Sequence, residues 1–252
     1  MFANERRLKI AELVADKQSV TVSDLMKRFG VSIETIRRDL EYLEKQRVLS
    51  RVHGGAVTLK MQRFSQLSER LSENREQKRR LSQRAADCIV EGDRIAIDSG
   101  STAIELAQVL RERFHALTIV TNSPEVFEML YPVEGFELIQ TGGFYMKSER
   151  AFYGYITVDT LRGLHVSKSL IFPSAISLQH GVGVYVPELL EVERALMEIA
   201  DETILLADSS KFETTGALKL CDLKSIHRLV TDGDLSDAVY WLYAEAGVPI
   251  LR

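Results

Sequence analysis

Residues 31–45 carry two arginines and a lysine at a spacing that suits contact with nucleic acid. Ile36, Leu40 and Leu43 recur every three or four residues, which predicts an amphipathic helix with one apolar stripe. Basic side chains on the exposed face of such a helix can donate to base edges and phosphates in a DNA major groove. At about 100° per residue, the polar side and flanks of this helix hold Glu34, Thr35, Arg37, Arg38, Tyr42 and Lys45.

The same charges are consistent with the solvated side of an ordinary amphipathic helix, but the distribution of charge along the chain favours DNA binding. Residues 1–60 hold 12 Lys and Arg against 8 Asp and Glu, a net charge of +4. The whole chain has a net charge of −4, so residues 61–252 carry −8. A basic amino-terminal segment on an acidic body is expected when one module meets phosphate and the other does not.

The residues before this helix predict the rest of a helix-turn-helix. Residues 22–29 form a short helical pattern, and Gly30 supplies the left-handed residue that ends it. Ser32 is placed to cap the following helix through its hydroxyl. An earlier helix is expected over residues 4–15, and its inward side chains are expected to be Leu8, Ile10, Leu13 and Val14.

Two short strand-like runs, residues 49–52 and 56–59, follow the helix and flank His53. Such a hairpin after a helix-turn-helix is a wing. Arg51 and His53 are expected to meet phosphate there, as is Arg37, whereas Arg38 is expected to face base edges with Thr35 beside it.

The remainder of the chain alternates apolar runs of strand length with helical patterns. This alternation predicts an α/β domain in which helices cover a mainly parallel sheet. The expected strands are residues 94–98, 117–121, 136–140, 169–172, 203–207 and 228–231.

Polar residues concentrate where these strands end. Residues 95–107 read as a strand, a small-residue turn and then a helix, so that backbone N–H groups and two hydroxyls point outward, which suits an anion. Hydrogen-bonding side chains or glycines also end three other strands, at residues 121–123, 142–143 and 208–211. Each turn alone is consistent with a simple helix cap. Together, at the carboxyl ends of neighbouring strands, they predict a pocket for a polyhydroxylated anion.

The chain resembles the DeoR family of bacterial transcriptional regulators. Residues 31–40 reproduce the run V-S-x-x-T-I-R-R-D-L, and residues 51–56 reproduce R-x-H-G-G-A. The sensor half carries D-x-G-S-T, T-N-S, G-G and A-D-S-S-K-F in the family's order. The resemblance implies an amino-terminal winged helix-turn-helix domain followed by a larger α/β sensor domain, similar to ribose-5-phosphate isomerase and glucosamine-phosphate deaminase folds. Two departures are Arg47, where members commonly have Gly, and residues 167–174 in place of the family's usual strand.

The resemblance implies a sequence-specific DNA-binding regulator, a repressor of a carbohydrate-metabolism operon, controlled by a phosphorylated sugar. Candidate DNA-binding residues are Ser32, Glu34, Thr35, Arg37, Arg38, Tyr42, Lys45, Arg51 and His53. Candidate effector-binding residues are Asp98, Gly100, Ser101, Thr102, Thr121, Asn122, Ser123, Gly142, Gly143, Glu188, Asp208 and Lys211.

The expected organisation is a DNA-binding domain over residues 1–59, a linker over 60–75, and a sensor and oligomerisation domain over 76–252. A homodimer or homotetramer is expected, because one recognition helix gives only a short site. No cofactor and no metal are expected, because the five histidines show no short metal-ligand pair and the two cysteines lack a metal spacing. The chain has no apolar stretch long enough to span a bilayer, and a cytoplasmic location is expected.

Two alternatives stay open at this stage. A sugar-phosphate isomerase or deaminase-like enzyme that carries a DNA-binding module would use a carboxylate base from Asp98, Glu188 or Asp208. The other alternative is a sheet domain that serves only for dimerisation, through Phe127, Leu130 and Tyr131 or through residues 240–251. Core packing is the better explanation of those apolar residues. The sequence favours the non-enzymatic regulator.

Overall fold

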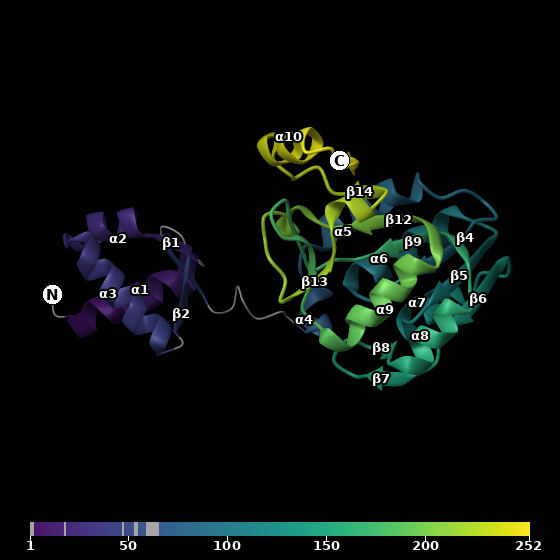
Figure 1. Cartoon of the computed structure of the whole chain (residues 1–252), viewed down its shortest axis with the longest axis horizontal. Coiled ribbons are helices and arrows are strands. Elements are labelled where there is room, and N and C mark those ends of the chain that lie inside the picture. Colours follow the sequence, from purple (N-terminus) through teal and green to yellow (C-terminus); the bar gives the residue numbers. More distant parts are fainter. Residues whose placement is uncertain (1–2, 18, 47, 53–54, 59–65) are drawn as a thin grey trace. The chain divides into compact units, whose positions relative to one another are not determined.

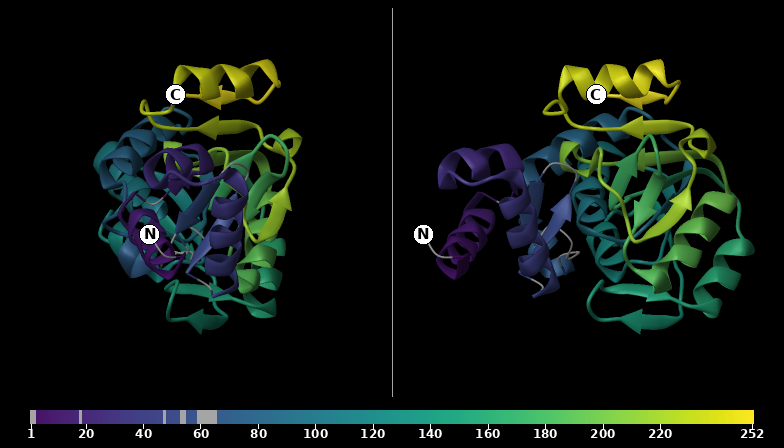
Figure 2. Two further views of the ribbon diagram at one scale, coloured as in Figure 1. Left: turned by 90° about the vertical axis from the view of Figure 1, so that its left-hand side faces the viewer. Right: turned by 60° about the vertical axis from the view of Figure 1, so that its left-hand side comes forward.

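A computed structural model describes residues 3–17, 19–46, 48–52, 55–58 and 66–252. The chain forms two compact units, residues 1–65 and 66–252, and each is described by itself (Figures 1 and 2). The elements of unit 1 are α1 (Ala3–Lys17), β1 (Ser19–Thr21), α2 (Val22–Phe29), α3 (Ile33–Lys45), β2 (Leu49–Val52) and β3 (Gly55–Thr58).

Local sequence signals explain the helix boundaries in unit 1. Thr21 caps α2 by accepting a hydrogen bond from the Asp24 N–H at 3.1 Å. Gly30 ends α2 with φ = 63°, the left-handed conformation that the sequence predicts. Ser32 caps α3 by accepting from the Thr35 N–H at 3.4 Å, which confirms its predicted role. The order of helices and wing strands agrees with the predicted winged helix-turn-helix.

The core of unit 1 lies where the three helices meet the small sheet. Ile10, Val14, Leu25 and Ile36 are almost completely buried in it. The prediction for Leu8 is wrong, because its side chain is 67% exposed. The buried face of α1 includes a charged residue, Arg6, in place of Leu8.

The wing strands belong to a three-stranded antiparallel sheet in the order β1-β3-β2. Sequence analysis predicted β2 and β3 but missed β1, which spans only three residues and pairs with β3 between Ser19–Thr21 and Gly55–Val57. Two residues between β2 and β3, His53 and Gly54, lie outside the described residues, as does Arg47.

Unit 2 is an α/β domain (Figure 1). Its helices are α4 (Leu67–Arg70), α5 (Arg75–Ala86), α6 (Ser101–Arg113), α7 (Pro124–Leu130), α8 (Tyr155–Arg162), α9 (Pro187–Glu198) and α10 (Asp237–Glu245), with 3-10 turns η2 (Ser209–Lys211) and η3 (Leu223–Ser225). Its strands are β4 (Arg94–Ile97), β5 (Leu117–Thr121), β6 (Phe136–Gln140), β7 (Phe144–Met146), β8 (Ala151–Tyr153), β9 (Val166–Ile171), β10 (Ala175–Ser177), β11 (Gly181–Val184), β12 (Ala200–Leu206), β13 (Leu218–Cys221), β14 (Arg228–Val230) and β15 (Ile250–Leu251).

The main sheet has seven strands in the order β15-β14-β12-β9-β4-β5-β6, and every neighbouring pair is parallel. All six strands predicted from sequence are members of it. Two smaller antiparallel sheets, β10-β11-β13 and β7-β8, complete the unit. The strands of these small sheets have only three or four residues, and sequence analysis did not predict them.

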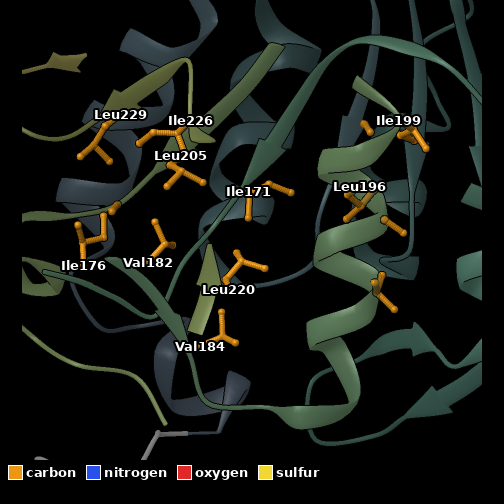
Figure 3. Close-up of a cluster of buried hydrophobic side chains, with 14 of the residues drawn as sticks. Ile171, Ile176, Val182, Val184, Leu196, Ile199, Leu205, Leu220, Ile226 and Leu229 are labelled. Atoms are coloured by element: carbon orange, nitrogen blue, oxygen red, sulfur yellow. The ribbon is translucent and has the colours of Figure 1, made fainter. Parts of the chain in front are cut away.

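Helices cover both faces of the main sheet. Ile95 and Ile97 of β4 point to the face that is packed by α5, α6 and α7, whereas Ala96 between them points to the opposite face. That opposite face packs against α8, α9 and the β10-β11-β13 sheet, and Figure 3 shows Leu196 and Ile199 of α9 beside Ile171 of β9. Burial on both faces explains why these strands are continuous apolar runs. Among the described residues, no helix is both long and apolar enough to cross a membrane.

Candidate functional site

Helix α3 presents its basic side chains to solvent and holds a carboxylate inside. Arg37 and Arg38 are both exposed, whereas Asp39 beside them is 1% exposed. The Asp39 carboxylate accepts from Arg6 Nε at 2.6 Å and from Arg7 Nε at 2.9 Å. Because Arg6 and Arg7 belong to α1, these ion pairs hold α3 in place on α1. Arg6 therefore occupies the inward position that the sequence pattern assigned to Leu8.

The other predicted DNA-binding residues on α3 differ in how free they are. Glu34 and Lys45 are exposed, and both form ion pairs along the helix, Glu34 with Arg37 at 3.9 Å and Lys45 with Glu41 at 2.8 Å. The Arg7 guanidinium lies 3.9 Å from the centre of the Tyr42 ring, a cation–π contact that engages one face of this exposed side chain. Thr35 Oγ1 lies 3.0 Å from Ser32 Oγ, so both hydroxyls belong to the helix cap. Arg51 lies in β2, and His53 is outside the described residues.

In unit 2, the strand order β12-β9-β4-β5-β6 brings the carboxyl ends of five strands side by side. The predicted effector residues that follow β4, β5, β6 and β12 therefore gather along one edge of the sheet. Glu188 is the exception, because it lies exposed in the first turn of α9.

The loop from β4 to α6 combines a buried carboxyl with a helix amino terminus. Asp98 is almost completely buried, and its Oδ1 accepts from the Ser99 N–H at 2.7 Å. Burial raises the pKa of Asp98 to about 7, although backbone hydrogen bonds and Arg70 act in the opposite direction. Gly100 has φ = 126°, and Ser101 and Thr102 begin α6. The first turn of a helix offers unpaired N–H groups, which favour an anion.

Asn122, after β5, has a buried acceptor without a protein donor in the described part of the chain. Its Nδ2 donates to Phe152 O at 3.2 Å, whereas its Oδ1 is buried without a hydrogen-bond partner among the described residues. Its two neighbours serve the local structure instead. Thr121 Oγ1 accepts from the Ser123 N–H at 3.1 Å, and Ser123 Oγ caps α7 through the Val126 N–H at 3.4 Å.

The two glycines after β6 differ from one another. Gly143 has φ = 132°, and a Cβ there would overlap Thr157 Oγ1 and Tyr153 O. A Cβ added at Gly142 would have its nearest neighbouring atom 4.0 Å away, and Gly142 O accepts from Thr157 Oγ1 at 2.6 Å. Gly143 is thus required by the backbone, whereas Gly142 is exposed beside it.

Asp208, after β12, connects this edge of the sheet to the segment before α5. Asn74 Nδ2 donates to Asp208 Oδ1 at 3.2 Å and to Ser210 Oγ at 3.1 Å. Lys211 Nζ lies 3.9 Å from the Asp208 carboxylate and remains partly exposed. A cation and a carboxylate therefore stand together at this strand end.

Sequence analysis missed a buried charged cluster at the same edge, formed by Arg70, Glu149 and Glu193 together with Asp98. Arg70 of α4 forms an ion pair with Glu149, which lies between β7 and β8, and its guanidinium lies near Gly100. Burial lowers the pKa of Arg70 and raises that of Glu149. Burial, and then the nearby Asp98 and Glu149, raise the pKa of Glu193 well above its usual value. Glu193 Oε2 has no hydrogen-bond partner among the described residues.

Lys78 of α5 is a second missed cation. Its Nζ donates to the carbonyls of Arg70 and Glu73, both at 2.6 Å, and so fixes the turn between α4 and α5. Burial lowers the pKa of Lys78 to about 8, against the attraction of Asp208. The burial of Lys78 and Arg70 was not predicted, because residues 60–80 are polar throughout and no pattern distinguishes these two residues from solvated charges.

The assembled edge can bind an anion and hydroxyl groups together. The start of α6, Arg70 and Lys211 offer donors and positive charge. Asn122 Oδ1 and Glu193 Oε2 offer acceptors that lack protein donors. Among the described residues, no group of three or more His, Cys, Asp or Glu is arranged to hold a metal ion.

Comparisons with known proteins cover both units. Residues 6–62 match the family model of the DeoR-like helix-turn-helix domain, and residues 73–233 match that of the DeoR C terminal sensor domain. YulB, an uncharacterized HTH-type transcriptional regulator of Bacillus subtilis (strain 168), is 35% identical over 240 residues, which cover 94% of this chain and 92% of the relative. The putative aga operon transcriptional repressor of Escherichia coli O157:H7 is 32% identical, with 98% and 93% covered.

Ribose 5-phosphate isomerase A from Neisseria gonorrhoeae is similar to 54% of this chain, over 53% of its own length, with a TM-score of 0.41 and 14% identity. The two family models together account for the winged helix-turn-helix and for most of the α/β unit. The relatives extend over nearly the whole chain at more than 30% identity. The chain therefore belongs to the DeoR family of DNA-binding transcriptional regulators.

Proposed function

We propose that this chain represses a carbohydrate-metabolism operon under the control of a phosphorylated sugar. The observation that carries this proposal is the polar edge of the sensor sheet, where cations, a helix amino terminus and unpartnered acceptors lie together. The name of one relative, a putative aga operon repressor, supports the direction of regulation.

The chemistry of this edge assigns roles to its residues. The first turn of α6, at Gly100, Ser101 and Thr102, would hold the phosphate, with Arg70 and Lys211 supplying positive charge. Asn122 Oδ1 and Glu193 Oε2 would accept from sugar hydroxyls. A ligand with both phosphate and hydroxyl groups would occupy the phosphate-binding donors and the hydroxyl-binding acceptors, whereas inorganic phosphate would occupy only the donors.

Arg70 offers a route from ligand to DNA binding. It belongs to α4, the first element after residues 59–65, and it pairs with Glu149 at the proposed effector site. A phosphate that binds Arg70 would weaken its ion pair with Glu149. The ion pair would then hold α4, the first element after residues 59–65, less firmly in the sensor unit. The effector thus shifts the population between two arrangements, of which DNA prefers one.

The proposal needs two further properties. A homodimer or homotetramer in the cytoplasm would place two α3 helices on a symmetric operator. Arg38 would reach base edges, and Arg37 and Arg51 would contact phosphate.

Fluorescence anisotropy on DNA from upstream of the chain's own gene and its neighbours tests the proposal. The titration is made at a stated salt concentration, because phosphate contacts make affinity depend on salt. A panel of sugar phosphates is compared with the corresponding free sugars. We expect tight binding that one phosphate ester changes and its free sugar does not. No specific binding at any salt concentration would refute the proposal.

One observation keeps an enzymatic alternative in view: burial raises the pKa of Asp98 to about 7, a value that suits proton transfer near neutral pH. We propose that Asp98 instead binds ligand hydroxyls and that the chain is not an enzyme. Steady turnover of ribose 5-phosphate or glucosamine 6-phosphate by the purified chain, lost in Asp98→Asn, would overturn this proposal.

A further inference from the structure

A polar cavity of about 540 Å³ lies in unit 2 beside α5. Its volume is within the range of roughly 300 to 1,000 Å³ that small-molecule sites occupy. Its walls come from α5, from the end of α6, from the loop after β14 and from the residue after β15. The lining residues are Arg80, Gln83, Arg84, Asp87, Arg113, Thr231, Asp232, Gly233 and Arg252. None of them belongs to the proposed effector site.

Arginine dominates this lining. Arg80 and Arg84 stand one turn apart on α5, Arg113 ends α6, and Arg252 follows β15. Arg84 is exposed and forms no ion pair among the described residues. Guanidinium groups pair with phosphate oxygens in a bidentate manner. The four guanidiniums come from three walls of the cavity, so together they can engage the oxygens of more than one phosphate group.

Carboxylates pair with three of the four arginines, and the Arg252 pair with Asp237 at 2.6 Å is the least exposed on the arginine side. Arg80 pairs with Asp234 at 2.6 Å and Arg113 with Asp87 at 2.7 Å, and all four side chains are more than 40% exposed. Exposed ion pairs are weak, so phosphate oxygens can replace them. Asp232 is engaged differently, because its two oxygens accept from the backbone N–H groups of Ser209 and Asp234.

Thr231 supplies an independent indication of a ligand. This residue is among those that line the cavity and is 1% exposed, and its Oγ1 is buried without a hydrogen-bond partner among the described residues. A buried hydroxyl without a partner is costly to the fold. A ligand oxygen in the cavity would satisfy it.

The lining also limits the kind of ligand. It contains no aromatic and no aliphatic side chain apart from the methyl group of Thr231, whereas sites for drug-like molecules are mostly apolar. We propose that this cavity binds a small metabolite that carries two or more phosphate groups, at a site separate from the effector site. The chain would thereby respond to two ligands.

Pyrophosphate is the probe for this site, and the thermal midpoint of the full chain is the readout. Ionic strength is held constant, and sulfate serves as the reference anion. The Ser101→Glu variant carries an anion at the proposed effector site, so it reports only binding elsewhere. We expect pyrophosphate to stabilise the wild-type chain and Ser101→Glu alike, and more than sulfate does. Loss of the effect in Ser101→Glu, or an equal effect of sulfate, would overturn the proposal.

Arg84→Ala and Arg79→Ala form a matched pair, because both arginines are exposed on α5 and only Arg84 lines the cavity. Arg84→Ala should weaken pyrophosphate binding by about tenfold, as expected for the loss of a charge-assisted contact. Arg79→Ala should leave binding unchanged within about twofold. Equal losses in the two variants would show unspecific attraction and refute the site.

Thr231→Val tests the placement of the ligand without removing a charge. The substitution keeps the shape of the side chain and removes the buried, unpartnered hydroxyl. We expect weaker pyrophosphate binding together with a thermal midpoint, in the absence of ligand, that is unchanged or raised. Binding equal to that of the wild-type chain would exclude Thr231 from the site and contradict the proposal.

Discussion

Asp39 stabilises helix α3 from within, although the sequence places it beside two basic residues that are proposed to face DNA. Its buried carboxylate joins α3 to Arg6 and Arg7 of α1. The R-R-D-L run of the DeoR family therefore combines exposed basic side chains with a buried carboxylate that holds the helix in place. Arg37 and Arg38 point outward, and Asp39 fixes the helix that carries them.

Replacing Asp39 with Ala should destabilise unit 1 by about 3 kcal/mol, because Arg6 would be left buried without its partner. Lys9→Ala is the control, since Lys9 belongs to an exposed ion pair with Glu5, and its cost should stay below about 0.5 kcal/mol. The single tryptophan, Trp241, lies in unit 2. Asp39→Ala should thus lower the unfolding transition seen by circular dichroism and leave the Trp241 fluorescence transition in place. An unchanged circular dichroism transition would contradict the structural role of Asp39.

The buried Asp98 should make the stability of unit 2 depend on pH. Burial raises its pKa from 3.8 to about 7, so the folded chain keeps a proton that the unfolded chain loses between these values. The resulting stabilisation is complete below pH 3.8 and is lost as the pH rises through about 7. Urea unfolding followed by Trp241 fluorescence at pH 5 and pH 8 measures this loss.

The loss between the two pH values should be smaller in Asp98→Asn, which cannot titrate, than in the wild-type chain. Asp159→Asn removes an exposed carboxyl on α8 and serves as the control. If Asp98→Asn and the wild-type chain lose the same stability, Asp98 is not the group responsible.

Helix α3 is the element whose exposed face we propose to contact DNA. Arg38→Ala should weaken binding to the specific operator by about 1 to 3 kcal/mol if Arg38 reads a guanine, and it should affect random DNA much less. Arg37→Ala should weaken binding to every sequence to a similar extent and reduce the salt dependence. Anisotropy on operator and random DNA at several salt concentrations separates the two. Equal weakening on both DNAs by Arg38→Ala would make it a phosphate contact.

The turn between β6 and β7 contains a second pair of residues that differ in role. Gly143→Ala should destabilise unit 2 by about 2 kcal/mol or more, because of its positive φ and the overlap with Thr157. Gly142→Ala meets no such contact and should change the stability by less than about 0.5 kcal/mol. Urea unfolding followed by Trp241 fluorescence compares the two variants. Similar stabilities would refute the assignment of the backbone role to Gly143.

Sequence patterns identified the elements that are buried continuously and missed those that depend on tertiary partners. The inner predicted strands are mostly buried apolar runs because both faces of the parallel sheet are covered, whereas the edge strand β6 is only partly buried. Strands of three or four residues, such as β1 and β7, leave too short a pattern to detect. Leu8 was assigned to the core because periodicity alone does not show that Arg6 has a buried partner in α3.

The same limitation applies to the candidate effector site. Loops at strand ends were predictable, since parallel strands end at one edge. Arg70, Glu149 and Glu193 come from two helices and a hairpin, and only the folded chain brings them together. Glu188 was selected through the family resemblance, and it lies exposed five residues before the buried Glu193.

At the scale of the whole molecule, sensing and DNA binding should be separable. Ser101→Glu places a carboxylate at the first turn of α6, where the proposed phosphate would bind. We expect it to abolish the effector response while DNA affinity in the absence of effector stays within about twofold of wild type. Ser101→Ala should retain most of the response, because the backbone N–H groups remain. Loss of both properties in Ser101→Glu would show that Ser101 is needed for the fold instead.

The order of strands in the main sheet also sets an order of events during translation. All elements of unit 1 lie within residues 3–58 and contact one another. This unit can therefore fold as soon as these residues have left the ribosome. The central strand β4 must wait for β9, which is synthesised after β5, β6 and the β7-β8 hairpin. Parallel pairing over such a separation is slow. The nascent chain therefore completes its helix-turn-helix well before its sensor sheet can close.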